Sequence, residues 1–323
     1  MTLTTRTGMR TNRFSATWRR SAAASLLFAF ALMAVACDAA TQAASPPTTS
    51  ATGVADPASD ETEQALSIVG VGSGTEKVLT APLHASGFDV TLDGSEITYT
   101  DLDEKGNDQV FVMDVDGSHQ RQLTHTELGV TRMGSPPQWS PDGSRIAYWM
   151  SLPASGVEIF VVRVSDGVSS RVTHEPKDVY EGGWASDRSF VFSISNPNSN
   201  YPLLARSIEL ETGETTTIAR DVSTPEVSPD GTQIAFDSYF GPTGEAWLSL
   251  MNVDGRGRRR IRQVSYSGSF PRWSPDSTKI AYLGSTEEDG SGTYIFDLTS
   301  GETRFVTAGT VESWIDDDHV LVS

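Results

Sequence analysis

A turn motif recurs along the chain at nearly equal intervals, and this repetition constrains the fold more than any other feature. Its clearest copies are Trp-Ser-Pro-Asp-Gly at residues 139–143 and Trp-Ser-Pro-Asp-Ser at residues 273–277. With the weaker copies included, the repeats begin at Val90, Trp139, Trp184, Val227, Trp273 and Trp314. A period of roughly 40–45 residues built from short strands is typical of a β-propeller with one four-stranded blade per repeat.

Each repeat contains the signals of four strands and two tight turns. Pro and Gly favour a turn after the first strand, because Pro presets φ and Gly tolerates positive φ. Residues 146–148 then form a short β-branched and aromatic strand, and residues 158–162 alternate as a third strand should. An Asp-Gly hairpin signal at residues 166–167 leads into the last strand, at residues 170–173.

The number of repeats predicts how the ring closes. Five repeats are complete, whereas the sixth, which begins at Trp314, has room for only two strands. The two missing strands are expected at residues 66–71 and 76–80, because an open ring would leave unpaired strand edges. We therefore predict an all-β, six-bladed β-propeller of four-stranded blades, closed by N-terminal strands that complete the C-terminal blade. A β-sandwich is the alternative, and six phased copies argue against it.

The Trp-Ser-Pro-Asp-Gly turn, the Ile-Ala-Tyr strand after it and the Leu-Thr-like ending resemble the TolB-type propeller repeat, also called PD40, which is WD40-like. The resemblance covers residues 65–323 and is specific for the fold rather than for a function. Similar blades occur in peptidase propellers of the prolyl-oligopeptidase type. A role like that of TolB would imply docking to a peptidoglycan-associated lipoprotein. TolB, however, is not lipidated and has an α/β domain before its propeller, for which residues 38–64 are too short.

Residues 1–36 have the pattern of an export signal peptide. A basic start that includes Arg19 and Arg20 precedes an apolar run at residues 21–36. That run of about 16 residues is shorter than a comfortable membrane span. Either the general secretory route or the twin-arginine route could carry the chain.

Cys37, the one cysteine of the chain, follows Ala34-Val35-Ala36 at the end of the apolar run. This resembles a bacterial lipobox, although Ala34 stands where Leu is usual. We expect Cys37 to be lipidated and to hold the protein at the cell membrane or envelope, facing outside the cytoplasm. Ordinary cleavage near Ala36 and a free thiol are the alternatives.

Residues 37–64 are rich in Ala, Thr, Ser and Pro and have almost no large apolar side chain. They cannot form a core, so we expect a disordered tether that spans about 25–30 Å. Residues 65–323 would then be the folded domain.

The acidic composition restricts the partners. The formal net charge is −18, with 42 acidic residues against 24 Lys and Arg. That balance argues against nucleic-acid binding and against contact of the domain with an anionic bilayer. We expect a monomer that binds one or more envelope proteins.

Sequence motifs for catalysis or metal binding are weak. No Gly-x-Ser-x-Gly elbow and no His-x-x-x-His spacing is present. Residues 101–108 loosely resemble a calcium loop, and residues 256–262 hold a cluster of arginines, but both fit solvated hairpins. We therefore predict no enzyme activity, no cofactor and no metal.

Long loops are the best candidates for a binding surface. In each repeat the loop between the second and third strands shares a face with the loop that joins successive blades, and aromatic residues gather there. The predicted partner-binding residues are Trp149, Tyr180, Tyr201, Tyr239, Phe240, Tyr266 and Phe270. Several of them could instead pack between blades. The alternative function is a carbohydrate- or lactone-active or -binding propeller with a metal at the central channel.

Overall fold

The computed structural model describes residues 65–80, 84–127, 136–195, 203–240, 245–264, 268–286 and 288–323. All of them belong to one compact unit, Ser59–Ser323. The described residues form 24 β-strands and no α-helix. Within this part of the chain there is accordingly no helix with the length and apolar character needed to span a membrane.

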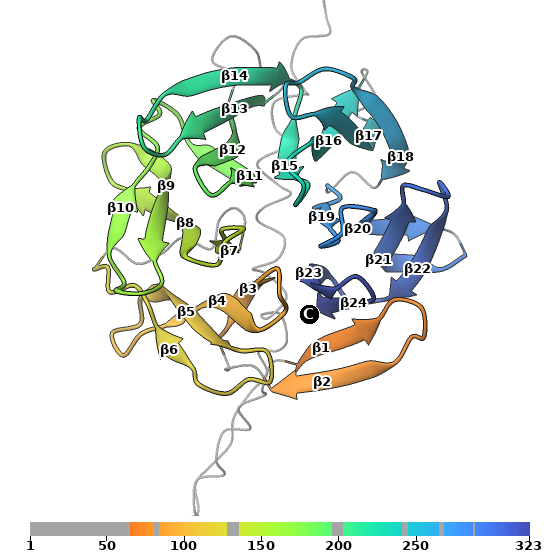
Figure 1. Cartoon of the computed structure of the whole chain (residues 1–323), viewed down its shortest axis with the longest axis horizontal. Coiled ribbons are helices and arrows are strands. Elements are labelled where there is room, and N and C mark those ends of the chain that lie inside the picture. The colour runs from red at the N-terminus through yellow and green to blue at the C-terminus, as the bar shows by residue number, and fades with distance from the viewer. Residues whose placement is uncertain are drawn as a thin grey trace, which may run out of the picture. The chain divides into compact units, whose positions relative to one another are not determined.

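The strands form six four-stranded antiparallel sheets around a central axis (Figure 1). The first, innermost strands of the blades are β3 (Ser86–Val90), β7 (Gln138–Trp139), β11 (Val179–Ser186), β15 (Ser223–Val227), β19 (Arg272–Trp273) and β23 (Val311–Asp316). The second strands are β4 (Glu96–Leu102), β8 (Arg145–Leu152), β12 (Ser189–Ile194), β16 (Gln233–Phe240), β20 (Lys279–Thr286) and β24 (His319–Val322).

The outer half of each blade has the same order. The third strands are β5 (Asp108–Asp114), β9 (Gly156–Arg163), β13 (Leu204–Glu209), β17 (Glu245–Asn252), β21 (Gly290–Asp297) and β1 (Ala65–Gly70). The outermost strands are β6 (Arg121–Gln122), β10 (Ser169–Arg171), β14 (Thr215–Arg220), β18 (Arg259–Val264), β22 (Thr303–Thr307) and β2 (Glu76–Thr80). The predicted six-bladed propeller is confirmed.

The two ends of the domain close the ring as the sequence predicts. The sheet of the last blade has the order β2-β1-β24-β23, and Val69 pairs with Val320 across the junction. The backbone N–H of Val71 also donates to the carbonyl of Asp318 at 2.7 Å. Leu66 is fully buried in the cluster that contains Leu321, so the closing strand is part of the core.

The repeated turn is held by its own polar side chains. The hydroxyl of Ser140 donates to Asp142 at 2.7 Å and accepts the N–H of Arg145 at 3.0 Å. Gly143 has φ +68°, which favours glycine. The same bonds recur in the turns that begin at Ser228 and Ser274, so the motif is a structural element of the blade.

Tryptophans at the repeated position join neighbouring blades. The indole N–H of Trp184 donates to the backbone carbonyl of Gln138 at 3.1 Å, one blade earlier in the chain. The indoles of Trp273 and Trp314 make the equivalent bonds, at 3.1 and 2.9 Å. The indole nitrogen of Trp139 is buried without a partner in the described part of the protein. Each bond satisfies a buried carbonyl and fixes the spacing of two inner strands.

Candidate functional site

The six innermost strands line a central channel whose two ends differ. We call the end at the Ser-Pro-Asp-Gly turns the turn face, and the end at the loops between second and third strands the loop face. The channel contains two cavities along its length. We call the cavity nearer the turn face the turn-side cavity and the other the loop-side cavity. Strand β15 runs past both: Thr224 and Pro225 line the loop-side cavity, Val227 lines the turn-side cavity, and Glu226 lines both.

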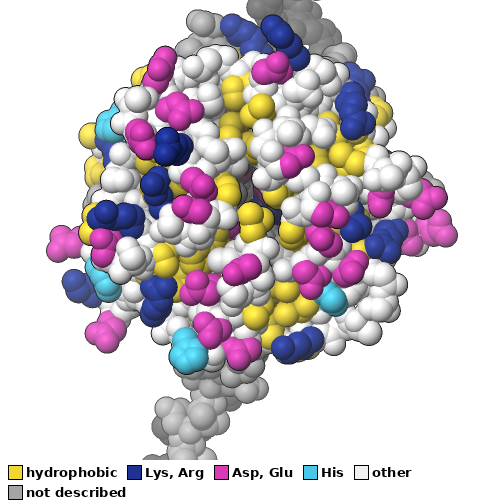
Figure 2. Space-filling view, in the orientation of Figure 1, with side chains coloured by type: hydrophobic (Ala, Val, Ile, Leu, Met, Phe, Trp, Pro, Cys, Tyr) yellow, Lys and Arg dark blue, Asp and Glu magenta, His cyan; other side chains and the backbone are white. Residues whose placement is uncertain are grey.

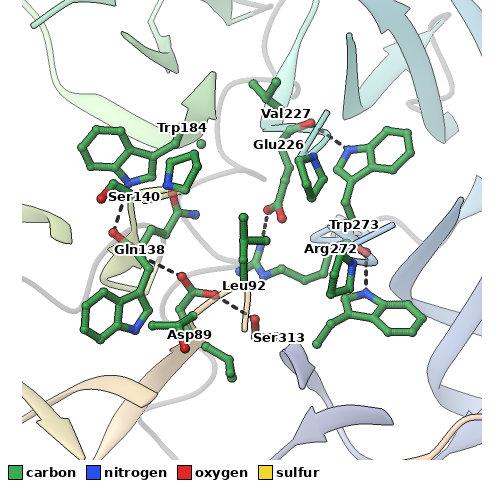
Figure 3. Close-up of a pocket in the computed structure, with 18 of the residues that line it drawn as sticks. Asp89, Leu92, Gln138, Ser140, Trp184, Glu226, Val227, Arg272, Trp273 and Ser313 are labelled. Atoms are coloured by element: carbon green, nitrogen blue, oxygen red, sulfur yellow. Dashed lines mark hydrogen bonds and ion pairs between the residues drawn. The ribbon is translucent and has the colours of Figure 1, made fainter. Parts of the chain in front are cut away.

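The mouth of the turn-side cavity is apolar. Three prolines of the repeated turns, Pro141, Pro229 and Pro275, line it together with Leu92. The side chain of Leu92 is 46% exposed, which is unusual for a large hydrophobic residue in this domain. Leu92 lies over the centre of the channel in Figure 3. The middle of the molecule in Figure 2 is hollowed and bordered by hydrophobic side chains.

Asp89 forms one side of the polar floor below this mouth. Its carboxylate accepts the backbone N–H of Trp139 at 2.9 Å and the hydroxyl of Ser313 at 2.8 Å, so it joins three blades. Burial raises the pKa of Asp89, although these two hydrogen bonds and the charge of Arg272 oppose the rise.

Glu226 and Arg272 form the other side of the floor (Figure 3). Their Oε2 and Nη1 atoms form an ion pair at 2.8 Å, and the Nε of Arg272 donates to the carbonyl of Glu312 at 2.8 Å. Burial raises the pKa of Glu226 to about 7, with Arg272 lowering it and the charge of Asp89 raising it. The ion pair separates the two cavities, because both residues line each of them.

Gln138 and Trp139 contribute polar atoms without partners. The side-chain oxygen of Gln138 and the indole nitrogen of Trp139 are buried and make no hydrogen bond within the described structure. Both residues line the turn-side cavity and are 7% and 6% exposed. Buried polar atoms without partners are uncommon in proteins, so these two mark the cavity as a site that can take a ligand.

The loop-side cavity is bordered by strained backbone. Thr224 and Phe270, which both line it, have φ of 48° and 45°. The buried carboxylate of Asp237 accepts the hydroxyl of Thr224 at 2.8 Å and, next to Phe270, the backbone N–H of Ser269 at 2.7 Å, so it holds both segments. Burial raises the pKa of Asp237 and of Glu181, another residue of this cavity. Strain of this kind persists where surrounding bonds enforce it.

The structure corrects one of the aromatic residues predicted for the loop face. Trp149 is 1% exposed and belongs to β8, where it packs in a core cluster and donates to the carbonyl of Tyr180 at 3.2 Å. The expectation that Trp149 is an exposed loop residue was wrong, because β8 extends through Leu152 and carries Trp149 between blades.

The other predicted residues are spread over the loop face. Tyr180 is half-buried on β11, and its hydroxyl lies 3.2 Å from that of Ser195. Phe270 borders the loop-side cavity. Tyr239 and Phe240 end β16, but their side chains lie outside the described part of the structure. Tyr201 and Tyr266 lie outside the described residues altogether. Partner binding by these residues stays a prediction.

The remaining candidates fall into two groups. Cys37, the signal segment 1–36 and the tether 37–64 lie outside the described residues. Residues 101–108 form the hairpin between β4 and β5, as predicted, and Asp103 accepts the backbone N–H of Asn107 there at 2.8 Å. In the described ranges, no three His, Cys, Asp or Glu side chains are grouped to hold a metal ion.

Sequence reasoning missed the floor of the turn-side cavity, although a positional signal existed. The residue immediately before each repeated Trp or Val lines this cavity in all six blades. These residues are Asp89, Gln138, Gly183, Glu226, Arg272 and Ser313. Five of the six are polar at a position that faces the axis, and the phase of the repeat would have selected them.

A closed six-bladed ring with a partly polar cavity on its axis defines the class of this protein as a β-propeller with a central cavity. The chain belongs to the TolB beta propeller family, whose domain model matches residues 60–275. It is 26% identical over 225 residues to a TolB homolog of Protochlamydia amoebophila, a match that covers 65% of this chain and 47% of that protein. An uncharacterized protein of Agrobacterium fabrum is 25% identical over 220 residues, covering 65% of this chain and 58% of the relative. The match thus spans about half the length of these relatives.

Solved structures agree on the fold. A TolB-like protein of Agrobacterium tumefaciens superposes with a TM-score of 0.66 at 18% identity, covering 80% of this chain and 97% of that one. An oligogalacturonate lyase in complex with manganese has the same fold, with a TM-score of 0.52 and 15% identity over 80% of this chain and 95% of the lyase. The same fold thus occurs in a TolB-like protein and in a lyase, so the fold by itself assigns no function.

Proposed function

We propose that this protein is a non-catalytic protein-binding propeller of the bacterial cell envelope, and that its partner docks at the turn face of the channel. The observation that supports this most is the mouth of the turn-side cavity. An exposed Leu92 and three prolines surround a concave site whose floor holds buried polar groups. Apolar walls with a few placed polar groups are typical of recognition sites, the walls giving affinity and the polar groups specificity.

The turn face suits docking because it is rigid. Its turns are fixed by Ser and Asp side chains within each blade, and the N–H of Asp142 donates to the carboxylate of Asp187 in the next blade at 2.9 Å. Asp276 makes the same contact to Asp317 at 2.9 Å. A preformed surface loses little conformational entropy when a partner binds.

The envelope location is supported by the family and by the N-terminal sequence. Relatives of the domain include a protein named as a TolB homolog. Residues 1–36 have the pattern of a signal peptide and Cys37 follows a lipobox-like segment, so we propose a lipid anchor on Cys37. The acidic composition of residues 38–64, with almost no large apolar side chain, suits a tether between that anchor and the propeller.

Photo-cross-linking in cells tests the docking face. A photoreactive amino acid is placed at Leu92 on the turn face, or at Leu102, which is 37% exposed at the loop-face end of the same blade. Val168, which is 53% exposed in a hairpin away from the axis, is a second control. We expect a discrete cross-linked protein from position 92 alone. Cross-links from 102 or 168 with none from 92 would refute the proposed docking face.

The anchor has its own test. The mass of the N-terminus of the mature protein, isolated from membranes, is compared with that of a Cys37→Ala variant. We expect a diacylglyceryl-sized mass on Cys37 and release of the variant into the soluble fraction. An unmodified N-terminus in soluble material would refute the anchor and leave the docking face untouched.

A further inference from the structure

Two carboxyl groups and one guanidinium line the turn-side cavity. Its charged side chains are Asp89, Glu226 and Arg272. Arg272 is committed to Glu226 through the 2.8 Å ion pair and donates further to the carbonyls of Glu312 and Pro271. Among the described residues no Lys, Arg or His forms an ion pair with Asp89, whose carboxylate accepts from the N–H of Trp139 and the hydroxyl of Ser313.

A second observation at the same place indicates what is missing. The side-chain oxygen of Gln138 has no donor among the described residues, and the residue is more than nine-tenths buried and lines the cavity. Figure 3 shows Gln138 and Asp89 on neighbouring inner strands at the same side of the channel, facing Glu226 and Arg272. Each carboxylate oxygen of Asp89 also has lone-pair capacity beyond the one bond that it accepts. The cavity thus offers free acceptors on Asp89 and Gln138, while Arg272, the positively charged donor in its lining, is engaged by Glu226.

The walls above these acceptors define the rest of the ligand. Leu92, the prolines of the turns and Trp139 are apolar, so a group that enters from the turn face passes an apolar collar before it reaches the floor. A lysine side chain has this distribution, with an aliphatic stem and an ammonium that carries three donors. An arginine fits the floor less well, because its guanidinium carries five N–H donors in a fixed fork, whereas an ammonium carries three that can rotate.

We propose that the partner inserts a lysine side chain into the turn-side cavity, where Asp89 and the Gln138 oxygen accept hydrogen bonds from its ammonium. This inference rests on the proposed docking face and names the group that is recognised there. The raised pKa of Asp89 agrees with it, since the charge of Arg272 only partly offsets the burial of this carboxyl and an ammonium in contact with it would offset more.

The test uses two small probes that differ only at the tip. Nα-acetyl-lysine amide, which keeps its side-chain ammonium, and the uncharged Nα-acetyl-norleucine amide are titrated into the purified full chain. Binding is followed by the indole N–H resonance of Trp139, assigned by its loss in Trp139→Phe. We expect the lysine probe to shift this resonance saturably and the norleucine probe to leave it in place. Equal responses to both probes would overturn the proposal.

The decisive variant is Gln138→Met, because it removes the acceptor without changing the net charge. Non-specific electrostatic attraction between the lysine probe and this acidic protein is therefore the same in Gln138→Met as in the parent. We expect its affinity to fall about tenfold, since a hydrogen bond to a charged group is lost. Thr126→Val is the matched control, because it also removes a buried oxygen without a partner, outside this cavity. Both variants should fold at least as stably as the parent.

The outcomes separate this inference from the docking face. A Gln138→Met protein that binds the lysine probe as the parent does would overturn the lysine site, even if position 92 still cross-links a partner. Absence of a cross-link from position 92 would overturn the docking face itself. Affinity lost in Gln138→Met and kept in Thr126→Val is the result that the proposal requires.

Discussion

Arg272 and Glu226 face each other from neighbouring inner strands and form an ion pair of 2.8 Å inside the channel. Their side chains are 13% and 18% exposed. The attraction does not offset the burial of Glu226, because its pKa is still raised to about 7. The pair therefore adds little to the stability of the fold at neutral pH. Its structural role is to separate the two cavities, because both residues line each of them.

The stability of the protein should fall as the pH rises from about 4.5 to about 7. A carboxyl whose pKa is higher in the folded state than the unfolded value of 4.5 binds its proton more tightly when folded, so its contribution is lost as pH rises through the folded pKa. For Glu226 the loss is on the order of 3 kcal/mol. Denaturant unfolding across this window measures it. Glu226→Gln should flatten the slope, and an unchanged slope in that variant would contradict the raised pKa.

The tryptophan bond between blades can be measured by a matched pair of substitutions. Trp184→Phe removes the donor to the carbonyl of Gln138, whereas Trp139→Phe removes an indole nitrogen that has no partner. Both residues are almost fully buried, so the lost ring volume is comparable. We expect Trp184→Phe to destabilise the protein by about 1 kcal/mol more than Trp139→Phe. Equal losses in chemical denaturation would show that the bond contributes nothing.

Ring closure predicts a strong effect of a residue near the start of the domain. Leu66 is fully buried against the first and last blades, whereas Val78 in the same hairpin is 63% exposed. Leu66→Ala should lower the free energy of unfolding by about 2–5 kcal/mol. Val78→Ala should stay within about 0.5 kcal/mol of the parent. If the two variants were equally stable, β1 would not be part of the closed core.

The architecture could be predicted because each blade has the same turn chemistry. Ser140, Asp142 and Gly143 make the turn by local bonds, so the repeated motif places the strand ends directly. Two strands at each end of the domain were left over after the five complete repeats, and pairing them predicted how the ring closes. These features depend on neighbouring residues and are visible in the sequence alone.

The site could not be located in the same way. Trp149 follows a short apolar run and looked like the start of a loop, but β8 continues past it and buries it against the next blade. Asp89, Gln138, Glu226 and Arg272 are separated by about one repeat each and become neighbours only when the ring closes. Their burial and pairing depend on that closure, which a single repeat does not reveal.

The affinity of the cross-linked partner for two leucine variants tests the central claim most directly. Leu92 and Leu102 belong to the same blade and are both exposed, but Leu92 lies on the turn face and Leu102 on the loop face. In calorimetric titration we expect Leu92→Ser to weaken binding about tenfold or more and Leu102→Ser to leave it unchanged. Loss of affinity in Leu102→Ser with full binding in Leu92→Ser would place the partner on the loop face and contradict this account.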